Sequence, residues 1–326
     1  VDSANDLAAN ADVVLAVGTR LQDFISGSNT LFKGQVIQLN VQPMDAVKYR
    51  AQSLLSDAKL GLQVLSSELG AYVTPAAWQQ RAAEGINAWA QLCESILPAT
   101  NEQVIPSDAQ VIAAVNSSVD ENAVVVAAAG SLPSELHKHW RAEQVGGYHL
   151  EYGYSCMGYE ICGGVGAKLA CPDREIVVMV GDGSYMMMNS DIATAVSMGL
   201  KLTIVVLDNR GFSCINRLQM ATGGANFNNL LKDTYHQGLA QIDFAGHAQS
   251  MGAHAIHVDD IGGLKQAVQA ARMRTGVSVV VIDTDPLICS PGGAYWEVEV
   301  PEVSAREEVA TQHQEWTAKR IANRGY

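Results

Sequence analysis

Short apolar runs alternate with helical segments through the carboxyl-terminal two thirds of the chain, and this alternation constrains the fold more than any other feature. The predicted strands are 123–128, 176–180, 202–207, 255–258 and 277–283. The predicted helices are 108–119, 160–170, 186–198, 243–251 and 261–274. The strand runs are continuously apolar and rich in Val and Ile, which is typical of parallel strands covered on both faces. We therefore predict an α/β fold with a doubly wound parallel sheet, whose ligands bind beyond the carboxyl ends of the strands.

The first part of the chain holds only two predicted strands, 13–17 and 36–41, followed by one amphipathic helix. Two strands are too few for an independent α/β domain, so this region is interpreted as part of a second, Rossmann-like middle domain. The predicted division is a partial middle domain over 1–70, a linker with a helix over 71–105, the main domain over 106–300 and a C-terminal tail or helix over 301–326. We expect the chain to begin inside a longer polypeptide.

Composition and charge exclude several classes of protein. Hydrophobic residues make up 48% and charged residues 17% of the 326 residues, which excludes a disordered or low-complexity chain. A net charge of −13 makes nucleic acid or an anionic membrane surface an unfavourable partner. The sequence has no long apolar run and no secretory signal, so a cytoplasmic protein without a membrane span is expected. The cysteines lack metal-binding or redox spacing and are expected to be reduced, mostly buried thiols.

The motif that indicates chemistry is Gly181-Asp182-Gly183, which follows one buried strand, together with Asp208-Asn209, which follows the next. One helix and one strand fit between them, so neighbouring strands would deliver Asp182 and Asn209 to the same edge of the sheet. Carboxylate and amide oxygens are ligands suited to Mg²⁺ or Ca²⁺. The glycines let the backbone approach a bulky anion, and the helix from Ser184 directs free N–H groups toward it. The pair predicts a divalent cation that binds a diphosphate, although either segment alone would be an ordinary turn.

Two other sequence features are interpreted as structural. Gly163-Gly164-Val165-Gly166 follows no strand, so we expect a small-residue helix packed against the sheet rather than a dinucleotide-binding loop. The histidines show no H-E-x-x-H pattern. His137 and His139 lie near the proposed diphosphate turn, and a structural or merely exposed role is favoured for them.

The two strand-end segments resemble the thiamine-diphosphate-dependent enzymes, whose signature is G-D-G followed, one helix and one strand later, by N-N. The chain departs from this signature at Asp208, which stands where the family has its first Asn. The resemblance implies two cofactors, thiamine diphosphate and Mg²⁺. It also implies that Asp182, Asn209 and the backbone carbonyl of Gly211 hold the metal ion against the diphosphate. Because the first Asn is not a metal ligand in the family, the departure leaves this assignment intact.

The resemblance assigns further cofactor contacts around the metal site. Residues 152–159 precede the Gly-rich helix, where the family places the residue that holds the cofactor in its bent form. By position this residue is Met157, and the carbonyl of Ser155 would accept a hydrogen bond from the aminopyrimidine ring. The turn after the first strand of the domain would supply a second phosphate contact. The implied cofactor-binding residues are Gly130, Ser131, Leu132, Ser155, Met157, Gly181, Gly183, Ser184, Asn209 and Gly211.

Within the family, the segments 130–138, 152–167 and 208–219 are most similar to hydrolases of inositol catabolism that open a cyclic 1,2-dione. The resemblance implies cleavage of the bond between the two carbonyls to give a deoxyglucuronate, with the cofactor as electron sink. It also implies a homo-oligomer, a dimer or tetramer, with sites at the subunit interface. The family's pyrimidine-binding domain, which carries the glutamate that activates the cofactor, has no counterpart here. The resemblance therefore implies that the chain is the C-terminal half of a longer enzyme, and that by itself it binds the cofactor weakly and does not turn over.

Two other functions stay open from the sequence. A carboligase or decarboxylase similar to acetolactate synthase would use the same scaffold, and residues 1–70 would then be part of a flavin site in some relatives. A catalytically inactive cofactor-binding module would keep the fold without the reaction. The missing glutamate domain favours this second possibility for the chain in isolation.

Overall fold

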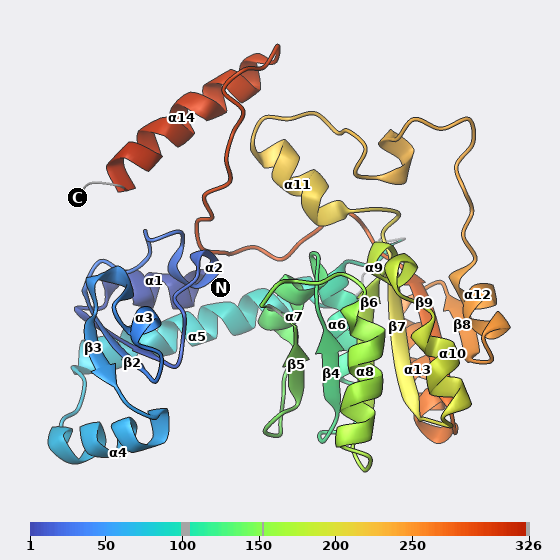
Figure 1. The fold of residues 1–326 in the computed structure, drawn as a ribbon, viewed down its shortest axis with the longest axis horizontal. Coiled ribbons are helices and arrows are strands. Elements are labelled where there is room, and N and C mark those ends of the chain that lie inside the picture. The colour runs from blue at the N-terminus through green and yellow to red at the C-terminus, as the bar shows by residue number, and fades with distance from the viewer. Residues whose placement is uncertain (99–104, 152, 324–326) are drawn as a thin grey trace. The chain divides into compact units, whose positions relative to one another are not determined.

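The structure is a computed structural model that describes residues 1–98, 105–151 and 153–323. The chain folds into two compact units, both drawn in Figure 1. The larger unit is Ile96–Ser290, and the smaller unit combines Val1–Ser95 with Pro291–Tyr326. The four-part division into domains made from the sequence stays a prediction.

A six-stranded sheet forms the centre of the larger unit. Its strands are β4 (Val124–Ala127), β5 (Tyr148–Leu150), β6 (Ile176–Gly181), β7 (Leu202–Asp208), β8 (His254–Val258) and β9 (Val277–Asp283). They lie in the order β5-β4-β6-β7-β9-β8, and every neighbouring pair is parallel. The chain leaves β4 toward β5 on one side and then returns to β6 on the other, so the strand order reverses at β4 and β6. In sheets of this kind such a switch point opens a crevice at the carboxyl ends of the strands.

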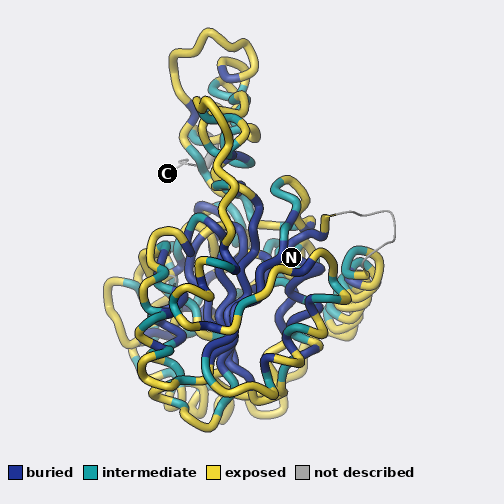
Figure 2. Tube along the Cα trace, turned by 90° about the vertical axis from the view of Figure 1, so that its right-hand side faces the viewer, coloured by how far each residue is buried: buried dark blue, intermediate teal, exposed yellow. Residues whose placement is uncertain are grey.

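Helices cover both faces of this sheet (Figure 1). One face carries α6 (Asp108–Asn116), α7 (Leu132–His139) and α13 (Ile261–Met273), and the other carries α8 (Tyr159–Ala170), α10 (Asp191–Ser197) and α12 (Phe244–Ser250). Successive residues of one strand enter opposite cores, with Val178 on the α8 side and Val177 and Met179 on the α6 side. Figure 2 shows these strands as the buried centre of the unit. The predicted doubly wound parallel α/β fold is confirmed.

The predicted small-residue helix over the Gly-rich segment is also confirmed, because Gly163 and Gly164 lie inside α8 and are buried. A Cβ atom at Gly164 would overlap the Cγ2 atom of Val178 on strand β6. Glycine therefore lets α8 approach the sheet more closely than any other residue would allow. The segment is a packing surface and not a phosphate-binding loop.

The helix predicted over 186–198 is wrong as a single element. The structure has α9 (Asp182–Met187) and α10 (Asp191–Ser197), separated at Met188, whose φ of −153° is extended rather than helical. Helix α9 begins at Asp182, four residues before the predicted start at Met186. Sequence reasoning also missed β5, α7, α11 (Ser213–Ala221) and the short η2 (Leu231–Asp233).

The smaller unit contains a three-stranded parallel sheet in the order β1-β2-β3. Its elements are α1 (Asp2–Asn10), β1 (Val13–Val17), α2 (Asp23–Ser26), β2 (Gln35–Asn40), α3 (Pro43–Ala46), η1 (Lys48–Arg50), β3 (Gln52–Leu55), α4 (Ala58–Leu69), α5 (Ala76–Ile96) and α14 (Glu307–Asn323). Strands β1 and β2 confirm the two predicted strands. Strand β3 was missed because it is short, begins with Gln52 and Ser53, and lacks the β-branched residues that mark strands.

Two expectations drawn from composition can be compared with the structure. Among residues 1–98, 105–151 and 153–323, no helix has the length and apolarity needed to cross a membrane. The prediction of mostly buried cysteines is wrong, because Cys93 is buried whereas Cys156 and Cys289 are exposed. Both exposed thiols lie in connecting segments, after β5 and after β9, rather than in the strands that form the core.

Candidate cofactor-binding site

A cavity of about 220 Å³ lies at the carboxyl ends of β4, β6 and β7. Every residue assigned to the cofactor or metal site from the sequence lines it: Gly130, Ser131, Leu132, Ser155, Met157, Gly181, Asp182, Gly183, Ser184, Asn209 and Gly211. These residues come from the turns after three strands and from the loop before α8. The fold therefore brings the whole predicted set together, although their roles toward a ligand stay predictions.

The metal-ligand candidates meet because their strands are neighbours. Strands β6 and β7 pair in parallel, with Gly181 opposite Leu207, so Asp182 and Asn209 emerge from adjacent strand ends. The backbone N–H of Gly211 donates a hydrogen bond to Oδ2 of Asp182 at 2.9 Å. Gly211 has a φ of 148°, and a Cβ atom there would overlap the carbonyl oxygen of Asn229, so this close approach requires glycine.

The side chain of Asn209 leaves one polar atom available. Its Nδ2 donates to the hydroxyl of Ser213 at 3.1 Å, while its buried Oδ1 has no hydrogen-bond partner among the described residues. A buried amide oxygen without a partner is costly unless something else binds it. An amide oxygen beside the Asp182 carboxylate is the donor set that a hard cation such as Mg²⁺ prefers. The residues present therefore fit the implied metal ion.

Electrostatics at Asp182 favour the same interpretation. Burial, reinforced by the nearby Asp208 carboxylate, raises the pKa of Asp182 to about 7. Asp208 does not line the cavity, and the Nε of Arg210 pairs with its Oδ2 at 3.2 Å. A divalent cation at Asp182 would offset both the burial and the repulsion, since it favours the charged carboxylate.

No cluster of three or more His, Cys, Asp or Glu side chains that could hold a metal occurs in the part of the chain that the structure describes. The implied ligands of the cavity are one carboxylate, one side-chain amide and one backbone carbonyl. Such a set leaves coordination positions open for phosphate oxygens, which is the usual arrangement for Mg²⁺.

Part of the cavity wall is apolar and includes Met157 and Phe212. A Cβ atom at Gly183 would lie 2.7 Å from Cε1 of Phe212 and 3.6 Å from Cε of Met157. Glycine at this position therefore leaves room for the ring of Phe212 beside the turn. Ser155, in the loop that carries Met157, has a φ of 53°, a conformation uncommon for a residue with a side chain.

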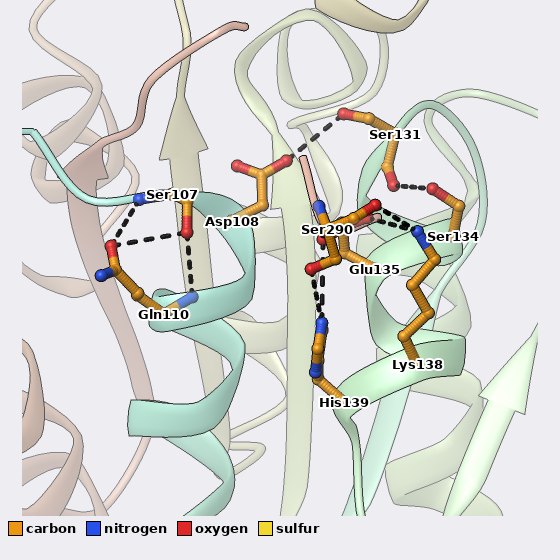
Figure 3. Close-up of polar contacts among 9 residues, drawn as sticks. All are labelled: Ser107, Asp108, Gln110, Ser131, Ser134, Glu135, Lys138, His139 and Ser290. Carbon is orange, nitrogen blue, oxygen red and sulfur yellow. Dashed lines mark hydrogen bonds and ion pairs between the residues drawn. The ribbon is translucent and has the colours of Figure 1, made fainter. Parts of the chain in front are cut away.

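The turn after β4 is held by a buried polar network. Ser131 donates its hydroxyl to Oδ2 of Asp108 at 3.3 Å (Figure 3). The hydroxyl oxygens of Ser131 and Ser213 lie 3.4 Å apart. Asp108 is the first residue of α6, whose start is fixed by a capping box between Ser107 and Gln110. The network thus links α6, the turn before α7 and the start of α11 around the cavity.

Helix α7 is anchored away from the cavity by contacts with Ser290 (Figure 3). Nε2 of His139 lies 2.6 Å from the Ser290 hydroxyl, and the Ser290 N–H donates to Oε2 of Glu135 at 3.0 Å. Lys138 donates to Oε1 of Glu135 at 3.1 Å and to the Ser290 carbonyl at 2.9 Å. His139 is buried and does not line the cavity, which agrees with the structural role favoured from the sequence.

Residues 128–282 match the protein family described as "Thiamine pyrophosphate enzyme, C-terminal TPP binding domain". This segment of the chain is therefore similar to the thiamine-pyrophosphate-binding domain of these enzymes. All the residues that line the cavity, apart from Asp108, fall within the matched segment of this domain.

Curated relatives match almost the whole chain. It is 35% identical over 337 residues to a 3D-(3,5/4)-trihydroxycyclohexane-1,2-dione hydrolase of Geobacillus thermodenitrificans, covering 94% of this chain and 52% of the relative. Proteins of the same name in Bacillus cereus and Bacillus anthracis are each 33% identical over 345 residues, covering 96% of this chain and 54% of the relative. The chain therefore spans about half the length of the curated relatives it matches.

Sequence reasoning missed several residues of the cavity wall: Asp108, Ala129, Leu207, Phe212, Ser213, Cys214 and Ile215. The residues after Gly211 could have been found from their position in the sequence, because they directly follow an assigned ligand and lead into α11. Asp108 gave no such signal, since Ser107-Asp108 reads as an ordinary helix start. Only the tertiary structure shows that this helix start faces the cavity.

A larger hollow of about 610 Å³ lies at the amino ends of β6 and β7. Its cations are already engaged: Arg272 pairs with Asp120 at 3.2 Å and with Glu175 at 3.1 Å. Arg174 donates to the backbone carbonyls of Asn122 and Val145. This hollow is a surface ion-pair region, and the smaller cavity at the opposite edge remains the candidate site.

The buried carboxyl of Asp108 provides a pH prediction. Burial raises its pKa from 3.8 to about 6, against the lowering effects of Thr284 and Arg217. Between these two values the folded state binds more protons than the unfolded state, so this group lowers the free energy of unfolding as the pH rises. The amide introduced by Asp108→Asn would not titrate, so the free energy of unfolding of this variant should not fall in this way. As the pH rises from about 4.5 to about 7.5, the difference in free energy of unfolding between the variant and the original chain should shift by roughly 1–3 kcal/mol in favour of the variant.

Urea unfolding of both proteins at the two pH values measures this difference. Asp182 and the other titrating groups are common to both proteins, so their contributions cancel in the comparison. If the two stability curves run parallel across this range, Asp108 does not carry the proposed burial penalty.

Proposed function

We propose that this chain supplies the thiamine-diphosphate- and Mg²⁺-binding half of an enzyme that hydrolyses a carbon–carbon bond in a cyclic 1,2-dione. The observation that carries the proposal is the cavity in which Asp182 and Asn209 meet, with an unsatisfied Asn209 Oδ1. The domain match and the names of the relatives support the cofactor and the reaction respectively. Trihydroxycyclohexane-1,2-dione would be the substrate and 5-deoxyglucuronate the product, in inositol catabolism.

In this proposal different residues of the cavity bind the metal ion, the diphosphate and the thiamine part of the cofactor. Asp182, Asn209 Oδ1 and the Gly211 carbonyl would hold Mg²⁺ on the diphosphate. Backbone amides of the turn 130–132 and of Gly183 and Ser184 would donate to the phosphate oxygens, because glycine leaves these backbones accessible.

The reacting end of the cofactor would lie toward the apolar wall. Met157 would hold the bent conformation, and the Ser155 carbonyl would accept a hydrogen bond from the aminopyrimidine. Bound thiamine diphosphate supplies a nucleophilic carbon and an electron sink for the cleavage of the bond between the two carbonyls. The apolar wall would lower the exposure of this end to water, while the metal ion would neutralise the phosphate charge.

The activating glutamate would come from a pyrimidine-binding domain supplied by sequence or subunits beyond this chain. We propose a homo-oligomer with composite sites, located in the cytoplasm. Turnover then requires such a domain, in the same polypeptide or in another subunit, and the chain by itself should bind without reacting.

Isothermal titration calorimetry tests the binding part of the proposal. The chain should bind thiamine diphosphate in the presence of Mg²⁺, and excess EDTA should remove most of the binding. Thiamine without its phosphates should bind far more weakly, because the metal anchors the diphosphate. Failure of the chain to bind thiamine diphosphate with Mg²⁺ would contradict the assignment of the cavity.

The reaction itself is tested on a polypeptide that also contains the missing region. Release of an acidic product from the cyclic dione supports the hydrolase, whereas condensation of two keto acids with no ring opening would support the carboligase instead. Recovered activity of either kind excludes an inactive binding module.

A further inference from the structure

Glu160 is a buried acidic residue among apolar and small residues. It is the second residue of α8, the only acidic residue of this helix, and its neighbours are apolar or small. It is 2% exposed, and burial raises the pKa of its carboxyl. It does not line the cavity. Neither the sequence signature nor the proposed cofactor contacts assign it a role.

The carboxylate of Glu160 binds three separate segments that each form part of the cavity wall. Oε2 accepts from the backbone N–H of Gly158 at 3.0 Å, and Oε1 accepts from that of Ala129 at 3.3 Å. The hydroxyl of Ser184 lies 2.8 Å from Oε1 and 2.7 Å from Oε2. The N–H of Gly158 also donates to this hydroxyl at 2.7 Å, which closes the network.

Each partner is directly connected to a residue proposed to contact the cofactor. Ala129 precedes the turn 130–132, Gly158 follows Met157, and Ser184 ends the turn that begins at Gly181. The backbone at Gly158 is already constrained, with a φ of 92° and no space for a Cβ atom, which would lie 2.8 Å from that of Met188. A single buried carboxylate thus fixes the loop of Met157 to the turn of Asp182.

Stability alone does not explain this arrangement. A buried carboxylate loses its hydration, and well-packed apolar residues are often as stabilising as a buried charged network. What the carboxylate does provide is a fixed geometry, because two oxygens in one plane hold three donors at set distances.

We propose that Glu160 is a positioning residue that sets the spacing between the Met157 loop and the Gly181–Ser184 turn, and so shapes the cavity for the thiamine part of the cofactor. This inference rests on the proposed function, because it concerns the fit of that cofactor. The proposed phosphate contacts of Ser184 and of the turn 130–132 are backbone amides that the ends of strands β6 and β4 also hold in place, so we expect them to depend on Glu160 less than the Met157 loop does.

The test compares two ligands on the 326-residue chain. Glu160→Gln keeps the side-chain size but replaces one acceptor by an amide donor that faces N–H groups. With Mg²⁺ present, the Kd for thiamine diphosphate should rise about ten-fold or more, which is the effect of losing one charge-assisted hydrogen bond. The Kd for inorganic pyrophosphate, which lacks the thiamine part, should rise less than about three-fold by the same reasoning.

Glu175→Gln is the matched control. Glu175 accepts from the N–H of Asp120 at 2.9 Å and pairs with Arg272 at 3.1 Å, in the hollow at the opposite end of the strands. Neither Kd should change in this variant. A general loss of stability would weaken the binding of both ligands to a similar extent. The ratio of the two Kd values therefore distinguishes a positioning role from destabilisation.

Hydrogen–deuterium exchange without any ligand tests the network itself. Peptides over 153–158 and 181–184 should exchange faster in Glu160→Gln than in the original chain. Should Glu160→Gln fail to fold, Ser184→Ala, which removes only the hydroxyl, must shift the ratio of Kd values in the same direction.

An unchanged ratio of the two Kd values overturns the inference, even if both ligands bind more weakly. Unchanged exchange overturns it as well. If the original chain binds neither ligand, the proposed function fails, and the exchange experiment then decides separately whether Glu160 braces the two segments.

Discussion

Replacing Asp182 with Ala should weaken the Mg²⁺-dependent binding of thiamine diphosphate by at least about 100-fold. The variant removes the only carboxylate among the three proposed ligands of the metal ion. It also removes the acceptor for the N–H of Gly211, which positions the third ligand. Calorimetry with thiamine diphosphate, with and without Mg²⁺, measures the loss.

Asp208→Asn is the control for this prediction. Asp208 is another buried aspartate, at the end of the neighbouring strand, but it lies outside the cavity lining. In the original chain the backbone N–H of Arg210 donates to Oδ1 of Asp208 at 3.0 Å, and the side-chain oxygen of an Asn could accept the same hydrogen bond. The control should bind nearly as well as the original chain. Equal loss in both variants, or none in Asp182→Ala, would contradict the metal-ligand assignment.

Replacing Gly164 with Val should lower the free energy of unfolding by about 3 kcal/mol or more. The new side chain would occupy space that Val178 already fills, at the contact between α8 and strand β6. Because packed interiors have few voids, the helix would have to move away from the sheet. Urea unfolding followed by circular dichroism measures the change in stability.

Gly166→Ala gives a matched comparison on the same helix. Gly166 is exposed, and no atom lies within 4 Å of a Cβ built there. Alanine is the better helix former, so this variant should be unchanged or more stable by up to about 1 kcal/mol. If Gly164→Val were as stable as Gly166→Ala, the close approach of α8 to the sheet would be wrong.

The sequence by itself determined the strands of the larger sheet other than β5, and the polar residues at the sheet edge. Continuous apolar runs indicate buried parallel strands, and in a parallel sheet the carboxyl ends of all strands lie at the same edge. Asp182 and Asn209 could therefore be placed together without knowing how the rest of the chain packs. The Gly-rich segment was equally local, because it lies within the helix predicted over 160–170, which the structure shows as α8.

Only the tertiary structure decided what surrounds these residues. Asp108 reaches Ser131, and Glu160 reaches Ala129 and Ser184, through contacts between segments that are distant in the sequence. A repeating pattern in the sequence cannot indicate such contacts. They depend on which strands become neighbours in the sheet, and neighbouring strands need not be consecutive in the sequence. The break between α9 and α10 is of the same kind. A helical pattern runs through Met188, but the chain turns there beside Gly158, where the two backbones are packed too closely to admit a Cβ atom.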